Sequence, residues 1–178
     1  LEQWMQESEE AAKKITLYFT DFKSFPQFVV ALVVVAGTAA ISEELLFRGV
    51  LQNILLKKWN NPHLAIWVAA FWFSFIHFQF YGFLPRLLLG AAFGYVYYFT
   101  GSIWYAVFAH FLNNAYAVCV AYYLQMNNQS YTNADDIDMP WYGYVISAIL
   151  TLALFVQISK KFKVKSEKSY DEHLQSDV

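Results

Sequence analysis

The stretch FPQFVVALVVVAGTAAISEELLFRGVLQNILL, residues 25–56, decides the fold. It is apolar over most of its length, and its only charged residues are Glu43, Glu44 and Arg48. If residues 28–56 form one helix, its roughly 29 residues measure ~43 Å, which exceeds the ~30 Å hydrocarbon core of a membrane. We therefore expect a membrane helix that tilts, protrudes or breaks, and that carries ionisable groups within the membrane.

The rest of the chain has the composition of a membrane protein. Hydrophobic residues make up 58% of the 178 residues and charged residues only 15%, whereas soluble domains contain ~45–50% apolar residues. Four more apolar segments are close to the ~20 residues that a membrane span requires, at about residues 62–80, 83–99, 102–125 and 141–158. The predicted fold is all-α, a polytopic transmembrane helix bundle with about five spans.

The two ends differ from this central part. Residues 1–24 are polar with a rough apolar stripe, which predicts an N-terminal amphipathic helix at the membrane surface or against the bundle. Residues 159–178 form a polar tail. We thus divide the chain into segments 1–24, 25–158 and 159–178, with residues 25–158 as the transmembrane domain.

The charge distribution excludes a nucleic-acid partner. The formal net charge is −2, and no basic stripe outside the C-terminal tail is present to follow a phosphate backbone. The expected partner is membrane lipid, while the sequence says nothing of the oligomeric state.

The two glutamates are expected to have different roles. An ionisable group inside a membrane costs roughly 2.5–3.5 kcal/mol on insertion scales, so it needs a partner or a function. Glu44 and Arg48 have the i, i+4 spacing of a helical ion pair, whereas Glu43 points about 100° away and is free to act as a base. The alternative is that Ser42 caps a helix after a break near Gly37 and that both glutamates complement the helix dipole.

Three further polar residues lie in apolar segments. His77 follows Phe73 by one turn, and Asn114 follows His110 by one turn, so each pair shares a helical face. The alternatives are an interfacial position for His77 and interhelical hydrogen bonding by His110 and Asn114. Together with Glu43, these residues supply a base and an oxyanion donor, which is what a hydrolase that activates water requires. The sequence has no serine in a nucleophile-elbow context and no His-Glu-x-x-His motif.

The polar residues, taken in order, resemble the motifs of the CPBP family of intramembrane proteases, which includes CAAX prenyl endopeptidases and bacteriocin-processing and self-immunity proteins. The resemblance covers residues 43–114 and consists of EExxxR, FxxxH and HxxxN, matched here by Glu43-Glu44-xxx-Arg48, Phe73-xxx-His77 and His110-xxx-Asn114. It implies an all-α membrane bundle that hydrolyses a peptide bond.

The resemblance also implies roles for these residues. Glu43 and His77 would activate water, and His110 and Asn114 would polarise the scissile carbonyl. Three residues would support that site: Glu44, Arg48 and Phe73. Zinc is a further expectation, with Glu43, His77 and His110 as its ligands, but a metal-free mechanism uses the same residues.

The leading hypothesis is an intramembrane endopeptidase of a bacterial plasma membrane. Its expected partners are membrane lipid and a membrane-associated protein or peptide substrate. One alternative is a non-catalytic membrane scaffold or bacteriocin immunity protein of the same fold. Another is a proton or metal-ion transporter, which would need polar residues along a path through the bundle, whereas these cluster.

Overall fold

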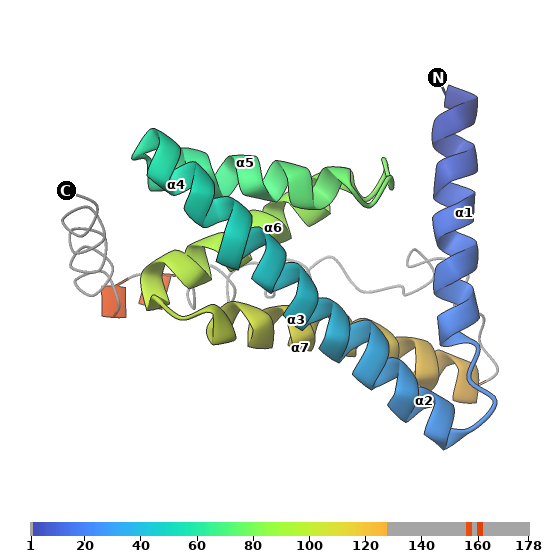
Figure 1. Ribbon diagram of the computed structural model, residues 1–178. Helices are drawn as coiled ribbons and strands as arrows, with labels where there is room; N and C mark the ends of the chain where they lie inside the picture. The colour runs from blue at the N-terminus through green and yellow to red at the C-terminus, as the bar shows by residue number, and fades with distance from the viewer. Residues whose placement is uncertain (1, 128–155, 158–159, 162–178) are drawn as a thin grey trace.

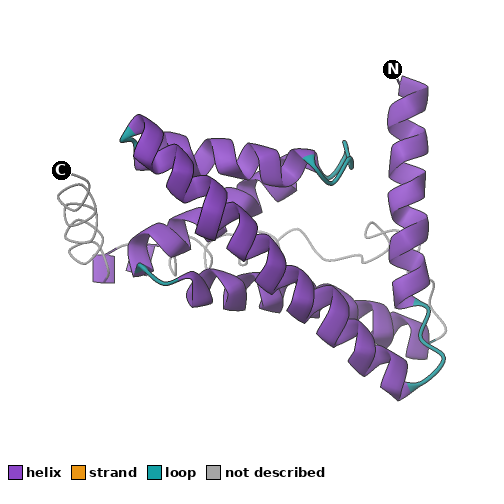
Figure 2. Cartoon of the chain, in the orientation of Figure 1, coloured by secondary structure: helices purple, strands orange, loops and turns teal. Residues whose placement is uncertain are grey.

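The computed structural model describes residues 2–127, 156–157 and 160–161. Within these residues the chain forms helices and turns and contains no strand, which confirms the all-α class (Figure 2). The predicted span at residues 141–158 and the tail at residues 159–178 lie outside the described residues, apart from the four named above. The expectation of five spans is therefore tested only in part.

The stretch that decides the fold forms one continuous helix of 35 residues, Phe25–Trp59 (Figure 1). Two π-helical segments lie within it, so that its elements are α2 (Phe25–Ala31), η1 (Leu32–Thr38), α3 (Ala39–Glu44), η2 (Leu45–Gln52) and α4 (Asn53–Trp59). The helix does not break near Gly37. It ends where Asn60 adopts a left-handed conformation with φ 50°, just before Pro62.

Three more helices pack against this one: α5 (Pro62–Phe75), α6 (Phe83–Thr100) and α7 (Ile103–Met126). Asn61 starts α5 by accepting a hydrogen bond from the backbone N–H of Leu64 at 3.0 Å, and Pro62 occupies the first turn. The α5 helix packs on α6, and α7 packs along η1 and α3. The long helix is thus held between the α5–α6 pair and α7.

The α5 helix ends at Phe75, before the predicted boundary at residue 80. The backbone N–H of His77 bonds to the carbonyl of Ser74 at 3.3 Å instead of continuing the helical pattern. The carbonyl of Phe73, which would accept that N–H in a helix, is bonded instead to Nδ1 of the His77 ring at 2.7 Å. Phe78 then adopts a φ of 51°, and the chain turns towards α6.

The N-terminal helix α1 (Glu2–Thr20) lies at the edge of the bundle (Figure 1). None of its residues is buried, and large apolar side chains such as Ile15 and Tyr18 are exposed. One ring contact ties it to the turn between α5 and α6, with the centroids of Trp4 and Phe80 5.3 Å apart. The predicted N-terminal helix is therefore present, and it is in contact with the bundle.

The core of the bundle is rich in alanine, while large apolar side chains face outwards. Ala36, Ala40, Ala65 and Ala106 have no exposed surface, which lets the helices approach closely. Two helices, Phe25–Trp59 and Ile103–Met126, are long and apolar enough to cross a membrane by length and composition, and Pro62–Phe75 is apolar but shorter. Two of the five predicted spans are therefore supported within the described residues.

Candidate active site

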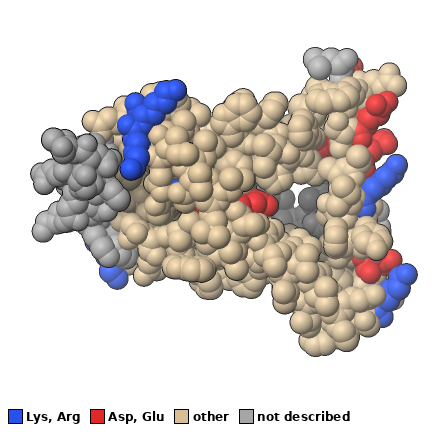
Figure 3. All heavy atoms as spheres, viewed as in Figure 1, with Lys and Arg blue, Asp and Glu red and all other residues tan. Residues whose placement is uncertain are grey.

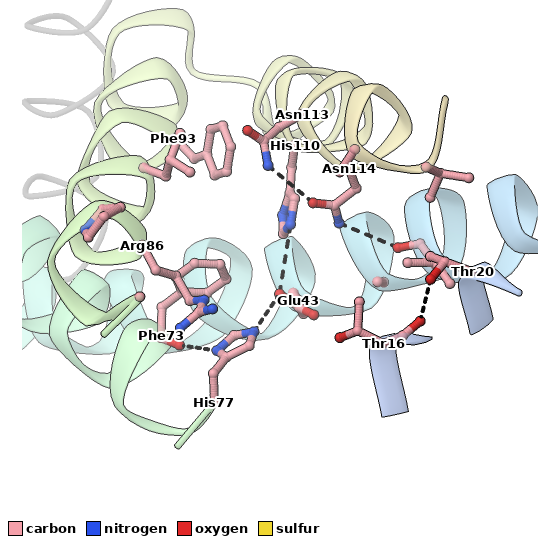
Figure 4. A pocket seen from close by; sticks show the side chains of 17 residues that line it. Thr16, Thr20, Glu43, Phe73, His77, Arg86, Phe93, His110, Asn113 and Asn114 are labelled. Atoms are coloured by element: carbon pink, nitrogen blue, oxygen red, sulfur yellow. Dashed lines mark hydrogen bonds and ion pairs between the residues drawn. The ribbon is translucent and has the colours of Figure 1, made fainter. Parts of the chain in front are cut away.

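The four residues predicted to be catalytic line one cavity of about 510 Å³, within the ~300–1,000 Å³ of ligand pockets (Figure 4). They come from three places in the fold. Glu43 comes from α3, His77 from the turn after α5, and His110 and Asn114 from α7. Residues that lie far apart in the sequence therefore meet at one site.

Glu43 lies between the two histidines. Its Oε2 atom is 3.9 Å from Nε2 of His77 and 3.8 Å from Nε2 of His110 (Figure 4). The Glu43 side chain is 27% exposed, whereas that of Glu44 is fully buried. Glu43 is thus the glutamate that faces the cavity, as its angular position on the helix predicts.

The hydrogen bonds of the two imidazoles fix which nitrogen faces Glu43. Nδ1 of His77 lies 2.7 Å from the Phe73 carbonyl, and Nδ1 of His110 lies 2.8 Å from Oε1 of Glu44. A carbonyl and a carboxylate only accept hydrogen bonds, so each Nδ1 carries the hydrogen. In the neutral rings the lone pair of each Nε2 atom faces the Glu43 carboxylate. Because the two Nε2 atoms and the carboxylate are all acceptors, a water molecule, a proton or a cation is needed between them.

The Glu44–Arg48 ion pair predicted from the sequence is confirmed. Nη1 of Arg48 donates to Oε1 of Glu44 at 2.8 Å, and Nη2 donates to the Gly90 carbonyl at 2.7 Å. The two side chains are 0% and 1% exposed, so the pair is shielded from solvent. Because Oε1 of Glu44 also bonds His110, this pair orients a residue of the site.

The alternative in which Ser42 caps a helix is wrong. Ser42 lies inside the continuous helix, and its hydroxyl donates to the backbone carbonyl of Thr38 at 2.8 Å. No helix N-terminus exists at this position for Glu43 and Glu44 to complement.

Phe73 packs between the ion pair and the histidines. Its ring centroid is 5.2 Å from that of His77 and 5.7 Å from that of His110. The guanidinium of Arg48 lies over the same ring, 4.8 Å from the centroid. The predicted shared face of Phe73 and His77 is therefore observed, although His77 lies beyond the end of α5.

Asn114 is partly engaged by its neighbours. Its Nδ2 donates to the Val35 carbonyl of η1 at 3.4 Å, and its Oδ1 accepts from Nδ2 of Asn113 at 3.2 Å. The first of these bonds is the interhelical contact that the sequence left open. An amide nitrogen has two hydrogens, so a second N–H remains for a ligand in the cavity.

The fit of zinc to this site is incomplete. The Nε2 atoms of His77 and His110 suit zinc chemically, and the bond of each Nδ1 to an oxygen is common for zinc-bound histidines. However, among the described residues no group of three His, Cys, Asp or Glu side chains is arranged to hold a metal ion. We therefore derive no reaction step through zinc, which stays a prediction.

Sequence reasoning missed the contribution of α6. The carbonyl of Gly90 accepts from Arg48, and the carbonyl of Gly94 accepts from Gln52 at 3.3 Å. A Cβ atom at Gly94 would lie 2.9 Å from side-chain atoms of Ile66 and Gln52, so a larger residue would force these side chains to shift. The sequence does contain a signal for this close approach. Gly90 and Gly94 form a GxxxG pattern, which is typical of close helix packing in membranes. Arg86, which also lines the cavity, was missed as well.

A buried ion pair that orients a glutamate–histidine site among apolar helices defines this protein as a candidate membrane hydrolase. Comparison with known proteins gives its family. The family profile "Type II CAAX prenyl endopeptidase Rce1-like" matches residues 25–116, about half of the chain, and the chain belongs to this family. The match includes every residue proposed for the site.

One curated relative supports the same family. Uncharacterized protein YpbD of Bacillus subtilis (strain 168) is 31% identical over 84 residues, which are 45% of this chain and 40% of YpbD. The matching part therefore spans less than half of that relative. No solved structure matches the chain.

The family is one of membrane-embedded CAAX proteases, and two helices of the described residues are long and apolar enough to cross a membrane. The scaffold or immunity alternative is not favoured.

Proposed function

We propose that this protein is an intramembrane endopeptidase that hydrolyses a peptide bond of a membrane-associated protein or peptide. The observation that carries the proposal is the position of Glu43. Its carboxylate faces a cavity and two Nε2 atoms at 3.8 and 3.9 Å, while the neighbouring Glu44 is held by Arg48. Glu43 is thus available for proton transfer, whereas Glu44 is held in the buried ion pair with Arg48.

In the proposed mechanism a water molecule is held between Glu43 and His77. It donates one hydrogen to Oε2 of Glu43 and the other to Nε2 of His77, because both atoms are acceptors. Glu43 takes the first proton as the water oxygen attacks the carbonyl carbon of the scissile bond. Glu43 then gives this proton to the leaving nitrogen, so that one water is consumed and a carboxyl and an amine are produced.

The opposite wall of the cavity stabilises the negative oxygen of the tetrahedral intermediate. Asn114 offers the amide hydrogen that does not bond Val35, and His110 would add a second donor if a proton enters the site and binds its Nε2 atom. The bond from Nδ1 of His110 to Glu44 holds the ring in the orientation that this donation needs. Arg48 acts through Glu44, and Phe73 acts by packing against both imidazoles.

The test compares native peptide termini in membranes of cells that express the wild type, Glu43→Gln or His110→Ala at matched levels. Loss of a general base typically reduces the rate by 10²–10⁴-fold, so termini made by the wild type should disappear in both variants. Lys58→Gln, an exposed substitution at the end of α4, serves as the control and should retain them. Equal termini in wild type and Glu43→Gln cells, with both proteins folded, would overturn the assignment.

The zinc expectation is tested separately on purified protein. The proposed mechanism uses Glu43 and His77 without a metal, so cleavage should survive removal of metals by a chelator. Loss of cleavage with the chelator and recovery with Zn²⁺ alone would instead assign the Oε2 and Nε2 atoms to a metal. Bound zinc would supply Lewis-acid activation of water.

A further inference from the structure

The N-terminal helix α1 forms one side of the active-site cavity while burying none of its own residues. Thr16 and Thr20 of α1 line the cavity together with Glu43 and His110 (Figure 4). The surface is hollowed between α1 and the bundle (Figure 3). Segments with few buried contacts are the ones that open at the lowest cost in free energy. The side of the cavity that α1 forms is therefore the one that can move most easily.

The C-terminal end of α1 is anchored to α7. Phe22, in the turn after α1, is 3% exposed, and its ring centroid lies 5.9 Å from that of Phe28 and 5.6 Å from that of Tyr122. The backbone N–H of Phe22 donates to Oε1 of Gln125 at 2.8 Å, and Nε2 of Gln125 donates to Oδ1 of Asp21 at 3.2 Å. The turn between α1 and α2 is thus a fixed point, about which the rest of α1 can turn.

The other end of α1 reaches the turn that carries His77. The ring centroids of Trp4 and Phe80 lie 5.3 Å apart, and Trp4 remains 50% exposed. The α1 helix therefore extends from α7, which carries His110, to the wall of the cavity that carries His77. Rotation about the anchored end would move α1 towards both histidines or away from them.

One face of α1 is suited to cover a polar site. Glu9, Thr16 and Thr20 are spaced so that, at about 100° per residue, their side chains point within ~40° of one another. Ile15 and Tyr18 point to the other side of the helix, and both are exposed. Because Thr16 and Thr20 line the cavity, the polar face of α1 is the one that faces it.

Glu9 on this face and Arg86 on α6 are opposite charges that lack partners. Nη2 of Arg86 donates to Oε1 of Gln79, whereas Nη1 is buried without a hydrogen-bond partner among the described residues. Oε2 of Glu9 is also buried without a partner in that part of the chain. Glu9 attracts Arg86 more strongly than Glu43 does, yet no ion pair joins Glu9 and Arg86 within the described residues. Unpaired buried polar atoms are costly, so a movement that joins these two is favourable.

We infer that α1 is a lid over the active-site cavity, which turns about its anchored end and closes when Glu9 pairs with Arg86. The inference rests on the proposed function, because it takes the cavity to be the active site. In the structure the lid is open, since the pair is not formed and the hollow remains (Figure 3). A closed lid blocks the entry of substrate, so the Glu9–Arg86 pair sets the fraction of molecules that can bind it.

The first test measures how fast a small probe enters the cavity. Cys119→Ser removes the single native thiol, and Ala117→Cys places a thiol on the cavity wall, in the full chain held in phosphatidylcholine nanodiscs. The probe is hydroxyethyl methanethiosulfonate, which is neutral and therefore insensitive to the charges that are changed. Addition of Glu9→Gln should raise the rate of thiol modification about two- to fivefold, as expected for the loss of one ion pair.

Matched substitutions assign such a change to the pair. Glu10→Gln removes the same charge from the next residue of α1, which is exposed and faces another direction, and it should leave the rate unchanged. The exchange Glu9→Arg/Arg86→Glu restores two opposite charges, so the rate should return towards that of the starting protein. Equal rates for Glu9→Gln and Glu10→Gln would overturn the inference.

The second test holds the lid closed. The pair Glu9→Cys/Arg86→Cys, in the Cys119→Ser background, should form a disulfide when oxidised with copper phenanthroline, because closure brings the two positions together. The substrate is a synthetic peptide with an S-farnesylated cysteine fourth from its C-terminus. The oxidised protein should lose cleavage of this peptide, and reduction with dithiothreitol should restore it.

The outcomes separate the lid from the proposed function. Failure of the disulfide to form, or full cleavage by the oxidised protein, would overturn the lid and leave the endopeptidase standing. Absence of cleavage by the wild type, with thiol modification still faster in Glu9→Gln than in Glu10→Gln, would support the lid and contradict the proposed function.

Discussion

Two faces of the same long helix meet opposite surroundings. Its closed face, formed by Glu44, Arg48 and Gln52, is buried against α6. Its open face, formed by Val35, Ala39 and Glu43, lines the cavity and is only partly buried. Residues on each face follow one another by four positions, so neighbouring glutamates fall on different faces. The comparison teaches that one helix can separate the residues that stabilise the fold from those that are available for chemistry.

The largest expected loss of stability comes from a substitution on the closed face. Arg48→Met leaves the Glu44 carboxylate buried without its cation, and breaking a buried pair in this way costs ~3–5 kcal/mol. We expect a large fall in the melting temperature of the purified protein in detergent. The double variant Arg48→Met/Glu44→Leu should regain much of the loss, because no charge is then stranded. Wild-type melting of Arg48→Met would show that the closed face does not stabilise the fold.

A smaller loss is expected where the closed face meets α6. The Cβ atom added by Gly94→Ala would lie 2.9 Å from Cγ2 of Ile66 and from Oε1 of Gln52. Overpacking of this kind typically costs ~1–3 kcal/mol. The control is Gly37→Ala in the long helix Phe25–Trp59, where the nearest atom is 3.7 Å from the added Cβ and the added helix propensity is worth ~0.5–1 kcal/mol. Thermal melting should therefore move in opposite directions for the two variants.

The smallest effect on stability is expected on the open face. Among the described residues Glu43 makes no hydrogen bond, and its contacts with the histidines are 3.8 and 3.9 Å long, so Glu43→Gln should change the free energy of unfolding by no more than ~0.5 kcal/mol. The same variant should lose peptide cleavage. Melting as low as that of Arg48→Met would contradict the division of the helix into two faces.

The sequence predicted the interactions that are local on one helix. The Glu44–Arg48 pair and the separate direction of Glu43 follow from helical periodicity, and the structure confirms both. The contact between Phe73 and His77 was also predicted, although its geometry depends on a helix end that periodicity did not reveal.

The interactions between distant segments could not be predicted in the same way. His110 bonds Glu44 across 66 positions of sequence, and Arg48 bonds the Gly90 carbonyl across 42. Both depend on how the helices pack, which local spacing does not determine. The buried Nη1 of Arg86 has the same origin, because only the folded cavity shows that this nitrogen has no acceptor among the described residues.

The two π-helical segments bear on how the chain tolerates changes in length. A π turn closes a hydrogen bond over one residue more than an α turn. Deletion of one residue within η1 or η2 would therefore be absorbed by conversion to an α-helix, rather than by a broken helix. Each residue of a π turn rotates the chain by less than the about 100° of an α-helical residue, so conversion to an α-helix would also keep the two ends of the helix nearly in phase. A single-residue deletion in η2 should therefore preserve both the helical content and the direction in which α4 faces.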